Sequence, residues 1–294
     1  MKATLDCLEC IASQALRAAR VATNDHALQR RIFDETVKRI PEMDLAKSPA
    51  ELSLIIYELA AGLTGNIDPY KTLKYEQNAA ALELEPQLRR LIETSTDPLA
   101  TSLHLAAAGN IIDLGIQTHG SIDVQAAIQQ AINERFAIDH SDEFRSSLSH
   151  CRDLLYLLDN AGEIVFDKIL IQELQKSTPV TAVVKAGPMI NDVLIADAEQ
   201  VGLTGVCSVI DCGGAFVGSP LGLVPESFKQ RLRQADMIVG KGQGNYETLD
   251  SFDGDVFLIL KAKCAIIAQH IGVDRGQVVL ISTRTRKNSR LPQT

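Results

Sequence analysis

Side chains that carry oxygen follow two of the short apolar runs in the second half of the chain. Asp159 and Asn160 come directly after the run 154–158, and Asp192 lies shortly after the run 180–184. If these runs are neighbouring parallel strands, their carboxyl ends lie at one edge of the sheet, and the three side chains converge there. Carboxylate and amide oxygens suit Mg²⁺ or Mn²⁺, whereas Zn²⁺ favours His and Cys ligands. The sequence therefore predicts a divalent-cation site, although Asp159 and Asn160 are equally consistent with a simple helix cap.

A glycine-rich segment follows the apolar run 237–239. Residues 240–248 read Gly-Lys-Gly-Gln-Gly-Asn-Tyr-Glu-Thr, with glycines at alternate positions. Such a backbone can approach a ligand closely and present its amides to an anion, which predicts a phosphate cradle. The segment matches neither the dinucleotide fingerprint nor the P-loop, and a plain glycine-rich turn is the alternative. The residues expected to contact phosphate or substrate are Lys241, Gly242, Gly244, Asn245 and Glu247.

Two lysines follow the apolar run 256–260, which the pattern identifies as the last strand. Lys261 and Lys263 would lie at the same edge of the sheet as the predicted cation site. A lysine there can pair with a substrate phosphate or with the carboxylates, and a solvated surface lysine is the alternative. The spacing does not choose between the two residues.

Two motifs lie in the helical first part of the chain. Asn110 and Asp113 interrupt a helical pattern and are candidates to line the substrate, although a turn that ends a helix explains them equally well. Cys7-x-x-Cys10 has no second pair at the spacing of a zinc finger. We interpret these two cysteines as buried core thiols, with a redox or auxiliary metal role as the alternative.

The spacing of apolar residues divides the chain into a helical first part and an alternating second part. The helical runs cover 10–40, 50–63, 70–92, 99–108 and 124–136, with a break expected near Pro86. The short apolar runs are 154–158, 180–184, 206–210, 237–239 and 256–260. Because they are continuous and alternate with helical patterns, they predict parallel strands buried on both faces. We therefore expect an α/β fold, a doubly wound Rossmann-like α/β/α layer with a helical N-terminal bundle. The expected domains are 1–95 for the bundle and 96–294 for the part that binds metal and phosphate.

Charge and composition narrow the class of partner. The chain of 294 residues has a net charge of -8 and no Trp, and 4% of its residues are aromatic. Nucleic-acid binding draws on clustered Lys and Arg and on stacking rings, so no nucleic-acid partner is expected. No apolar stretch is long enough to span a membrane, and the first residues lack the pattern of a secretory signal. We expect a cytoplasmic protein that binds a small phosphorylated metabolite and no membrane.

Taken together, the motifs resemble the DUF89 family of damage-control phosphatases. The resemblance covers nearly the whole chain, and it is to the prokaryotic branch that carries the N-terminal cysteine pair. Each motif is weak alone, but their combination in this order is specific. The segments that carry the resemblance are Cys7-x-x-Cys10, Gly109-Asn110-x-x-Asp113, Leu158-Asp159-Asn160-Ala161-Gly162-Glu163, Ile190-Asn191-Asp192, Lys241-Gly242-Gln243-Gly244-Asn245-Tyr246-Glu247 and Lys261-x-Lys263-Cys264.

The resemblance implies metal-dependent hydrolysis of phosphate monoesters, such as sugar phosphates or damaged phosphometabolites. It implies Mn²⁺, Co²⁺, Ni²⁺ or Mg²⁺ as the cation, Asp159, Asn160 and Asp192 as its ligands, and Lys263 as the lysine that binds phosphate. Asp159 and Lys263 are then the residues expected to carry catalysis, which for phosphoryl transfer rests on positioning and charge neutralisation. The alternatives are an S-adenosylmethionine-dependent carboxyl methyltransferase and a non-catalytic protein that binds metal or phosphometabolite. The missing glycine fingerprint after the first strand argues against the methyltransferase.

Overall fold

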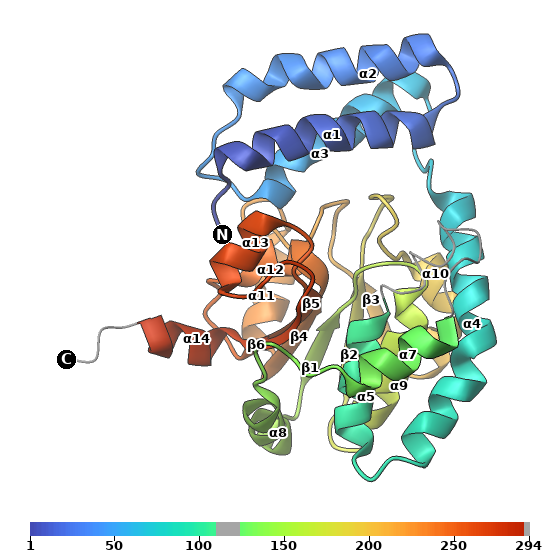
Figure 1. Cartoon of the computed structure of the whole chain (residues 1–294), viewed down its shortest axis with the longest axis vertical. Helices are drawn as coiled ribbons and strands as arrows, with labels where there is room; N and C mark the ends of the chain where they lie inside the picture. Colours follow the sequence, from blue (N-terminus) through green and yellow to red (C-terminus); the bar gives the residue numbers. More distant parts are fainter. Residues whose placement is uncertain (110–123, 291–294) are drawn as a thin grey trace.

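A six-stranded sheet forms the centre of the fold in the computed structural model, which describes residues 1–109 and 124–290 (Figure 1). The strands are β1 (Leu154–Leu157), β2 (Val180–Val184), β3 (Ser208–Asp211), β4 (Met237–Lys241), β5 (Val256–Lys261) and β6 (Val278–Ser282). They lie in the order β3-β2-β1-β4-β5-β6, in which β1 to β5 are parallel and β6 is antiparallel to β5. The strand order reverses between β1 and β4, so the predicted doubly wound layer is confirmed. Strand β6 is not among the predicted strands, although its residues form a continuous apolar run like those of the other strands.

Helices cover both faces of the sheet. Leu154 and Tyr156 of β1 pack in one cluster with α4 (Lys71–Glu93), α5 (Pro98–Ala108) and α9 (Glu163–Leu174). Leu155 and Leu157 pack in the other cluster with α11 (Glu226–Gln234), α12 (Gly242–Leu249) and α13 (Ala265–Ile271). Successive residues of a strand face opposite sides, so a strand buried on both faces is apolar throughout. Other helices in the described part of the chain are α7 (Val124–Asn133), α8 (Ser141–His150), α10 (Ile195–Gln200), α14 (Thr283–Arg290) and the 3-10 turns η1 (Ile40–Glu42) and η2 (Leu203–Gly205).

Three N-terminal helices form a separate layer, which we call the roof because it lies above the sheet in Figure 1. The roof consists of α1 (Leu5–Ala22), α2 (His26–Arg39) and α3 (Pro49–Thr64). Ile11, Ala15 and Ala18 of α1 recur every three or four residues and pack against Leu52 and Ile56 of α3. No helix within residues 1–109 and 124–290 has the length and apolar character needed to cross a lipid bilayer.

Helix α4 packs on the sheet rather than in the roof. Its buried Ala81 and Leu88 belong to the same cluster as α9, and Asn78 Nδ2 donates a hydrogen bond to Asp197 Oδ1 of α10 at 3.2 Å. Pro86 lies inside α4 without ending it, so the expected break is wrong. The packing on both sides of Pro86 outweighs the roughly 3 kcal/mol that an interior proline costs. We therefore propose that the two parts of the chain meet in the linker 65–70 rather than near residue 95.

Candidate functional site

The pairing of β1 with β2 brings the predicted cation ligands together. The two strands are parallel neighbours. Backbone hydrogen bonding between the segments that follow them continues beyond the strand ends, where Val193 N donates to Asp159 O at 3.0 Å. Asn160 and Asp192 face each other across an isolated bridge between the same two segments. Asp159, Asn160 and Asp192 therefore gather at the carboxyl edge of the sheet, as the strand-end pattern predicts.

The helix-cap alternative does not describe Asp159 and Asn160. Helix α9 begins after Gly162, and among residues 1–109 and 124–290 no side chain caps its first turn. Asn160 Nδ2 instead donates to Asp159 Oδ2 at 2.8 Å and to Glu163 Oε1 at 3.1 Å. These bonds hold the amide between two carboxylates. Sequence reasoning assigned no role to Glu163, although it stands in the same segment.

Carboxylates are crowded at this edge. Burial raises the pKa of Asp159 well above its usual range, and the charges of Glu163 and Asp192 raise it further. Burial likewise raises the pKa of Asp192, to about 6, although the Lys185 ammonium acts in the opposite direction. A cation bound among these groups would relieve their repulsion and favour the ionised forms.

Asp192 carries an unsatisfied oxygen. Within the described residues its buried Oδ2 makes no hydrogen bond, although Lys185 Nζ lies 3.5 Å away. That ammonium donates instead to Gly218 O at 2.6 Å. A buried carboxylate oxygen that makes an ion pair but no hydrogen bond is a position that a cation can fill. Within residues 1–109 and 124–290, no cluster of three His, Cys, Asp or Glu side chains has the arrangement of a metal site, so a cation here would depend on two carboxylates and the Asn160 amide.

A cavity of about 640 Å³ lies between the roof and this edge of the sheet, and we call it the edge cavity. Asp159, Asn160 and Asp192 line it from the sheet, and Lys263 lines it from the segment after β5. Lys263 also lowers the pKa of Asp159 through its charge. Lys261, the last residue of β5, is not among the lining residues, so of the two lysines Lys263 faces the cavity.

The prediction that Lys241 contacts phosphate is wrong for its side chain. Lys241 ends β4, and its ammonium donates to Ala106 O and to Asp167 Oδ1, each at 2.7 Å, with Glu163 Oε2 at 3.4 Å. Burial opposes its charge, but the carboxylates of Asp167 and Glu163 outweigh that effect and raise the pKa of Lys241. Tyr156 completes the group by donating to Asp167 Oδ1 at 2.8 Å. Lys241 thus neutralises the buried carboxylates of Asp167 and Glu163.

The glycine-rich segment is the start of helix α12 rather than a loop. Gly242 has φ +79°, and a Cβ atom there would lie 1.9 Å from Asp159 Oδ2, so the missing side chain makes room for the Asp159 carboxylate. Asn245 is buried and does not line the edge cavity, because it donates to Lys241 O at 2.8 Å and accepts from Ser219 Oγ at 3.0 Å. The prediction that Asn245 contacts substrate is therefore wrong for its side chain, which has a structural role. Gly244 and Glu247 do line the cavity.

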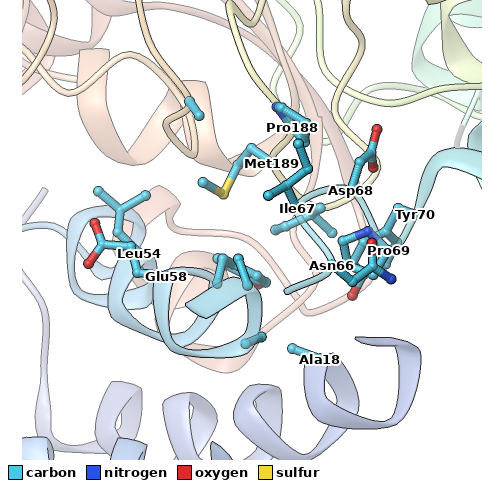
Figure 2. Close-up of a pocket in the computed structure, with 15 residues that line it drawn as sticks. Ala18, Leu54, Glu58, Asn66, Ile67, Asp68, Pro69, Tyr70, Pro188 and Met189 are labelled. Atoms are coloured by element: carbon cyan, nitrogen blue, oxygen red, sulfur yellow. The ribbon is translucent and has the colours of Figure 1, made fainter. Parts of the chain in front are cut away.

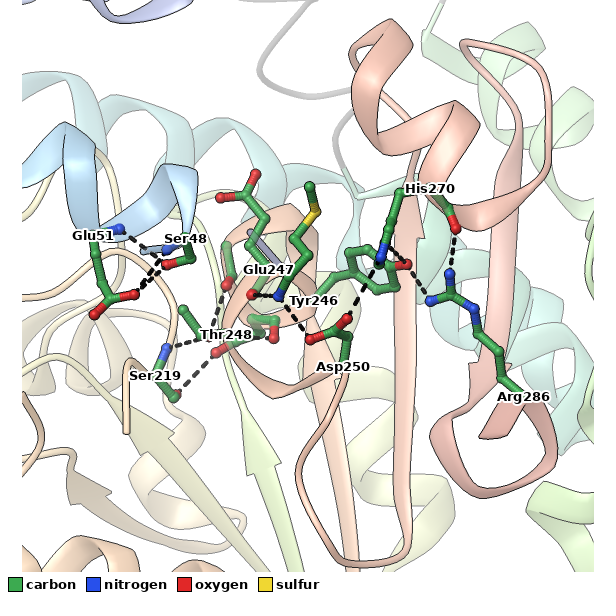
Figure 3. Close-up of polar contacts among 12 residues, drawn as sticks. Ser48, Glu51, Ser219, Tyr246, Glu247, Thr248, Asp250, His270 and Arg286 are labelled. Carbon is green, nitrogen blue, oxygen red and sulfur yellow. Dashed lines mark hydrogen bonds and ion pairs between the residues drawn. The ribbon is translucent and has the colours of Figure 1, made fainter. Parts of the chain in front are cut away.

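Polar contacts hold α12 in place, as Figure 3 shows. Thr248 Oγ1 accepts a hydrogen bond from Ser219 N at 2.9 Å, and Tyr246 Oη lies 2.7 Å from His270 Nδ1. Burial raises the pKa of Glu247 to about 7, against the hydrogen bond from Gln243. Glu247 therefore exchanges its proton near neutral pH while facing the edge cavity.

The cysteine pair only partly matches its interpretation. Cys7 is buried and accepts a hydrogen bond from Thr4 N at 3.4 Å, whereas Cys10 is exposed. Both line the edge cavity, so Cys10 is not a core thiol. The predicted substrate contacts of Asn110 and Asp113 lie outside the described residues.

Comparison with protein families gives a match over most of the chain. The model of the damage-control phosphatase ARMT1-like domain matches residues 3–279. The structure of a DUF89 family protein from Pyrococcus horikoshii is similar to this one, with a TM-score of 0.87 and 30% sequence identity. That similarity covers 96% of this chain and 99% of the other. The likeness confirms the α/β fold with its helical N-terminal part.

Archaeal relatives are similar along nearly their whole length. An uncharacterised protein of Methanocaldococcus jannaschii is 34% identical over 286 residues, which are 94% of each chain. A protein of Pyrococcus horikoshii named a damage-control phosphatase is 31% identical over 288 residues, covering 97% of this chain and 99% of its own. A protein of Archaeoglobus fulgidus with the same name is 30% identical over 288 residues, covering 95% and 98%.

Proposed function

The chain belongs to the damage-control phosphatase ARMT1-like family, and we propose that it hydrolyses phosphate monoesters of small metabolites with the help of a divalent cation. Two relatives carry the name damage-control phosphatase. The observation on this chain that supports the proposal best is the gathering of Asp159, Asn160 and Asp192 at the edge cavity. The Asp192 oxygen that makes no hydrogen bond within the described residues, and is paired only with the Lys185 ammonium at 3.5 Å, adds to it.

In this proposal Asp159, Asn160 and Asp192 hold the cation. Two carboxylates and an amide form an all-oxygen donor set, which suits Mg²⁺ or Mn²⁺, and the resemblance to the family adds Co²⁺ and Ni²⁺. When bound, the cation would supply charge neutralisation at a phosphoryl oxygen. Glu163 and Lys185 keep the ligands in position through the contacts described above.

The remaining groups of the edge cavity bind the phosphate and accept a proton from the attacking water. Lys263 neutralises phosphoryl oxygens, which is the main requirement of phosphoryl transfer besides positioning. Gly244 presents backbone at the start of α12, where a helix favours an anion. Glu247, with its pKa near 7, donates a hydrogen bond to the substrate when protonated and accepts one when ionised. The roof encloses the substrate, and the water that attacks phosphorus in line gives up a proton to a nearby carboxylate. The bond from phosphorus to the alcohol oxygen breaks, and the alcohol leaves after taking up a proton, so the products are inorganic phosphate and the free alcohol.

Phosphate release tests this function directly. The protein is expected to release phosphate from p-nitrophenyl phosphate and from sugar phosphates when Mn²⁺, Co²⁺, Ni²⁺ or Mg²⁺ is added. Asp192→Ala is expected to lose both this activity and cation binding by calorimetry, with unchanged circular dichroism. The control is Asp142→Ala, on the exposed side of α8 and away from the edge cavity. Full activity in Asp192→Ala would overturn the proposed site.

A further inference from the structure

A second cavity, of about 240 Å³, adjoins the edge cavity, and we call it the side cavity (Figure 2). It lies between α3, the linker 65–70 and the segment 188–190 that leads into the cation ligands. Met189 and Ile190 line it from the sheet, and Tyr57 and Ala61 line it from the roof. Ile190 also lines the edge cavity, so this residue borders both spaces.

Tyr57 connects the two cavities from the roof. It lines the side cavity, while its hydroxyl donates a hydrogen bond to Gln14 Oε1 at 3.3 Å. Gln14 in turn lines the edge cavity. Burial raises the pKa of Tyr57, and the charge of Asp192 contributes to that rise, which places the hydroxyl within electrostatic reach of the proposed cation site.

Ile190 is held in a strained conformation at the boundary. Its φ is +46°, the only positive value at a non-glycine residue within the described part of the chain. A β-branched side chain rarely adopts this region, which costs of order 1–3 kcal/mol and persists only where the surroundings impose it. The turn is closed by Asp192 N, which donates to Met189 O at 2.9 Å. The same backbone turn therefore positions both Asp192 at the site and the Ile190 side chain at the border of the two cavities.

Both cavities are lined by carboxylates, but they differ in whether basic side chains line them as well. Arg17, Lys263 and Arg275 are among the residues that line the edge cavity. Among the described residues that line the side cavity there is no Lys, Arg or His, and its charged side chains are the carboxylates of Glu58 and Asp68. Lys74 pairs with Asp68 at 3.3 Å but is not among the residues that line the side cavity. A second phosphate or a carboxylate of a ligand would thus meet no cation from the described lining of this cavity.

The remaining lining of the side cavity favours a flat uncharged group. Two aromatic residues, Tyr57 and Tyr70, line it, and Pro69, Pro188 and Met189 add apolar surface. Pockets of this composition bind rings by stacking and burial of apolar area.

We propose that the side cavity binds the uncharged distal part of the alcohol group of the phosphate ester, and that Ile190 sets how much of it can enter. This inference rests on the proposed phosphatase function. The phosphate end lies with the cations of the edge cavity, and the far end passes Ile190 to reach the tyrosine rings. The substrate class is a monophosphate whose alcohol is extended and uncharged at its far end.

Three matched esters test the inference: phenyl phosphate, biphenyl-4-yl phosphate and 4′-carboxybiphenyl-4-yl phosphate. The quantity measured is kcat/KM for phosphate release by the full chain with added Mn²⁺. The wild-type protein is expected to prefer the uncharged biphenyl ester over its carboxylate by about tenfold or more, because even one extra or missing methylene in a hydrophobic pocket is worth roughly 10- to 200-fold.

Two variants address the cavity itself. Ala61→Leu fills the side cavity and is expected to lower the ratio of biphenyl to phenyl ester by about tenfold. Ile190→Ala widens the passage and is expected to raise the same ratio. Ala27→Leu, the same substitution at an exposed position of α2 outside both cavities, is expected to keep the wild-type ratio.

Each outcome bears on one statement. If phenyl phosphate is hydrolysed but Ala61→Leu keeps the wild-type ratio, or the carboxylate ester is preferred, the side-cavity inference is wrong and the phosphatase function stands. If Ala27→Leu lowers the ratio as much as Ala61→Leu, the effect is not local and the inference is also wrong. If the wild-type protein releases phosphate from none of these esters with any of the four cations, the proposed function fails, and the inference fails with it.

Discussion

Gly242 offers a substitution that should separate the chemistry of the site from the stability of the fold. Its φ is +79°, and an added Cβ atom would lie 1.9 Å from Asp159 Oδ2 and 2.2 Å from Asp159 Cγ. Non-bonded atoms meet at about 3.5 Å, so in Gly242→Ala the carboxylate must move by roughly 1.5 Å. Asp159 is a proposed cation ligand, and the displacement acts on it directly.

The two effects of Gly242→Ala have different sizes. An alanine in the left-handed region costs about 1–2 kcal/mol of unfolding free energy, which a folded protein of this size can lose. A misplacement of about 1 Å in a reacting group costs about 100-fold in rate. We therefore expect kcat/KM for p-nitrophenyl phosphate to fall by about 100-fold or more, together with a loss of Mn²⁺ affinity.

The assay combines phosphate release, calorimetric Mn²⁺ titration and urea unfolding of the same preparations. The matched control is Gly205→Ala, because an added Cβ atom at Gly205 meets nothing within 4 Å and its φ lies outside the left-handed region. The control should keep wild-type activity and cation affinity. The reasoning is refuted if Gly242→Ala stays folded and its kcat/KM and Mn²⁺ affinity lie within about threefold of the wild-type values.

Three further predictions concern stability. Lys241→Met should lower the free energy of unfolding, measured in urea, by about 3–5 kcal/mol, because it leaves buried carboxylates without a counter-charge. Lys38→Met, at an exposed position, should change it by less than about 1 kcal/mol. Equal effects of the two substitutions would contradict the buried ion pair. Burial raises the pKa of Glu247 from 4.5 to about 7, so its contribution to stability is complete below about pH 4.5 and is lost as the pH rises to about 7. Glu247→Gln should therefore match the wild-type protein at pH 4 and exceed it by about 3 kcal/mol at pH 8 in urea unfolding, and a constant difference across pH would contradict this. Mn²⁺ at about 100 times its Kd should raise the melting temperature of the wild-type protein by an amount equivalent to about 2.7 kcal/mol of stability. A chelator should reverse this increase, and Asp192→Ala should not show it. The same increase in Asp192→Ala would mean that the cation binds elsewhere.

The part of the site that lies next to strand ends could be predicted from the sequence. Asp159, Asn160 and Asp192 follow apolar runs that became β1 and β2, and the pairing of these strands brings the side chains together. The contribution of the roof could not be predicted in this way. Gln14 and Tyr57 are ordinary positions on amphipathic helices, and no local pattern shows that these helices cover the edge of the sheet rather than one of its faces.

The error at Lys241 has a physical cause in the pleat of a strand. Residues within a strand point alternately to the two faces of the sheet, and only residues beyond its last position can turn toward the edge. Lys241 is the last residue of β4 and shares a face with Met237 and Val239, where it meets Asp167 of α9. Lys263, by contrast, lies beyond the end of β5 and faces the edge cavity. The apolar run in the sequence ends at Val239, two residues before the strand does, because glycine and a buried ion pair continue β4 without hydrophobic side chains. Predicting which residues face a site at the edge of a sheet therefore depends on knowing where hydrogen bonding between the strands stops. The apolar pattern marks the end of a strand only when the last residues of the strand are themselves apolar.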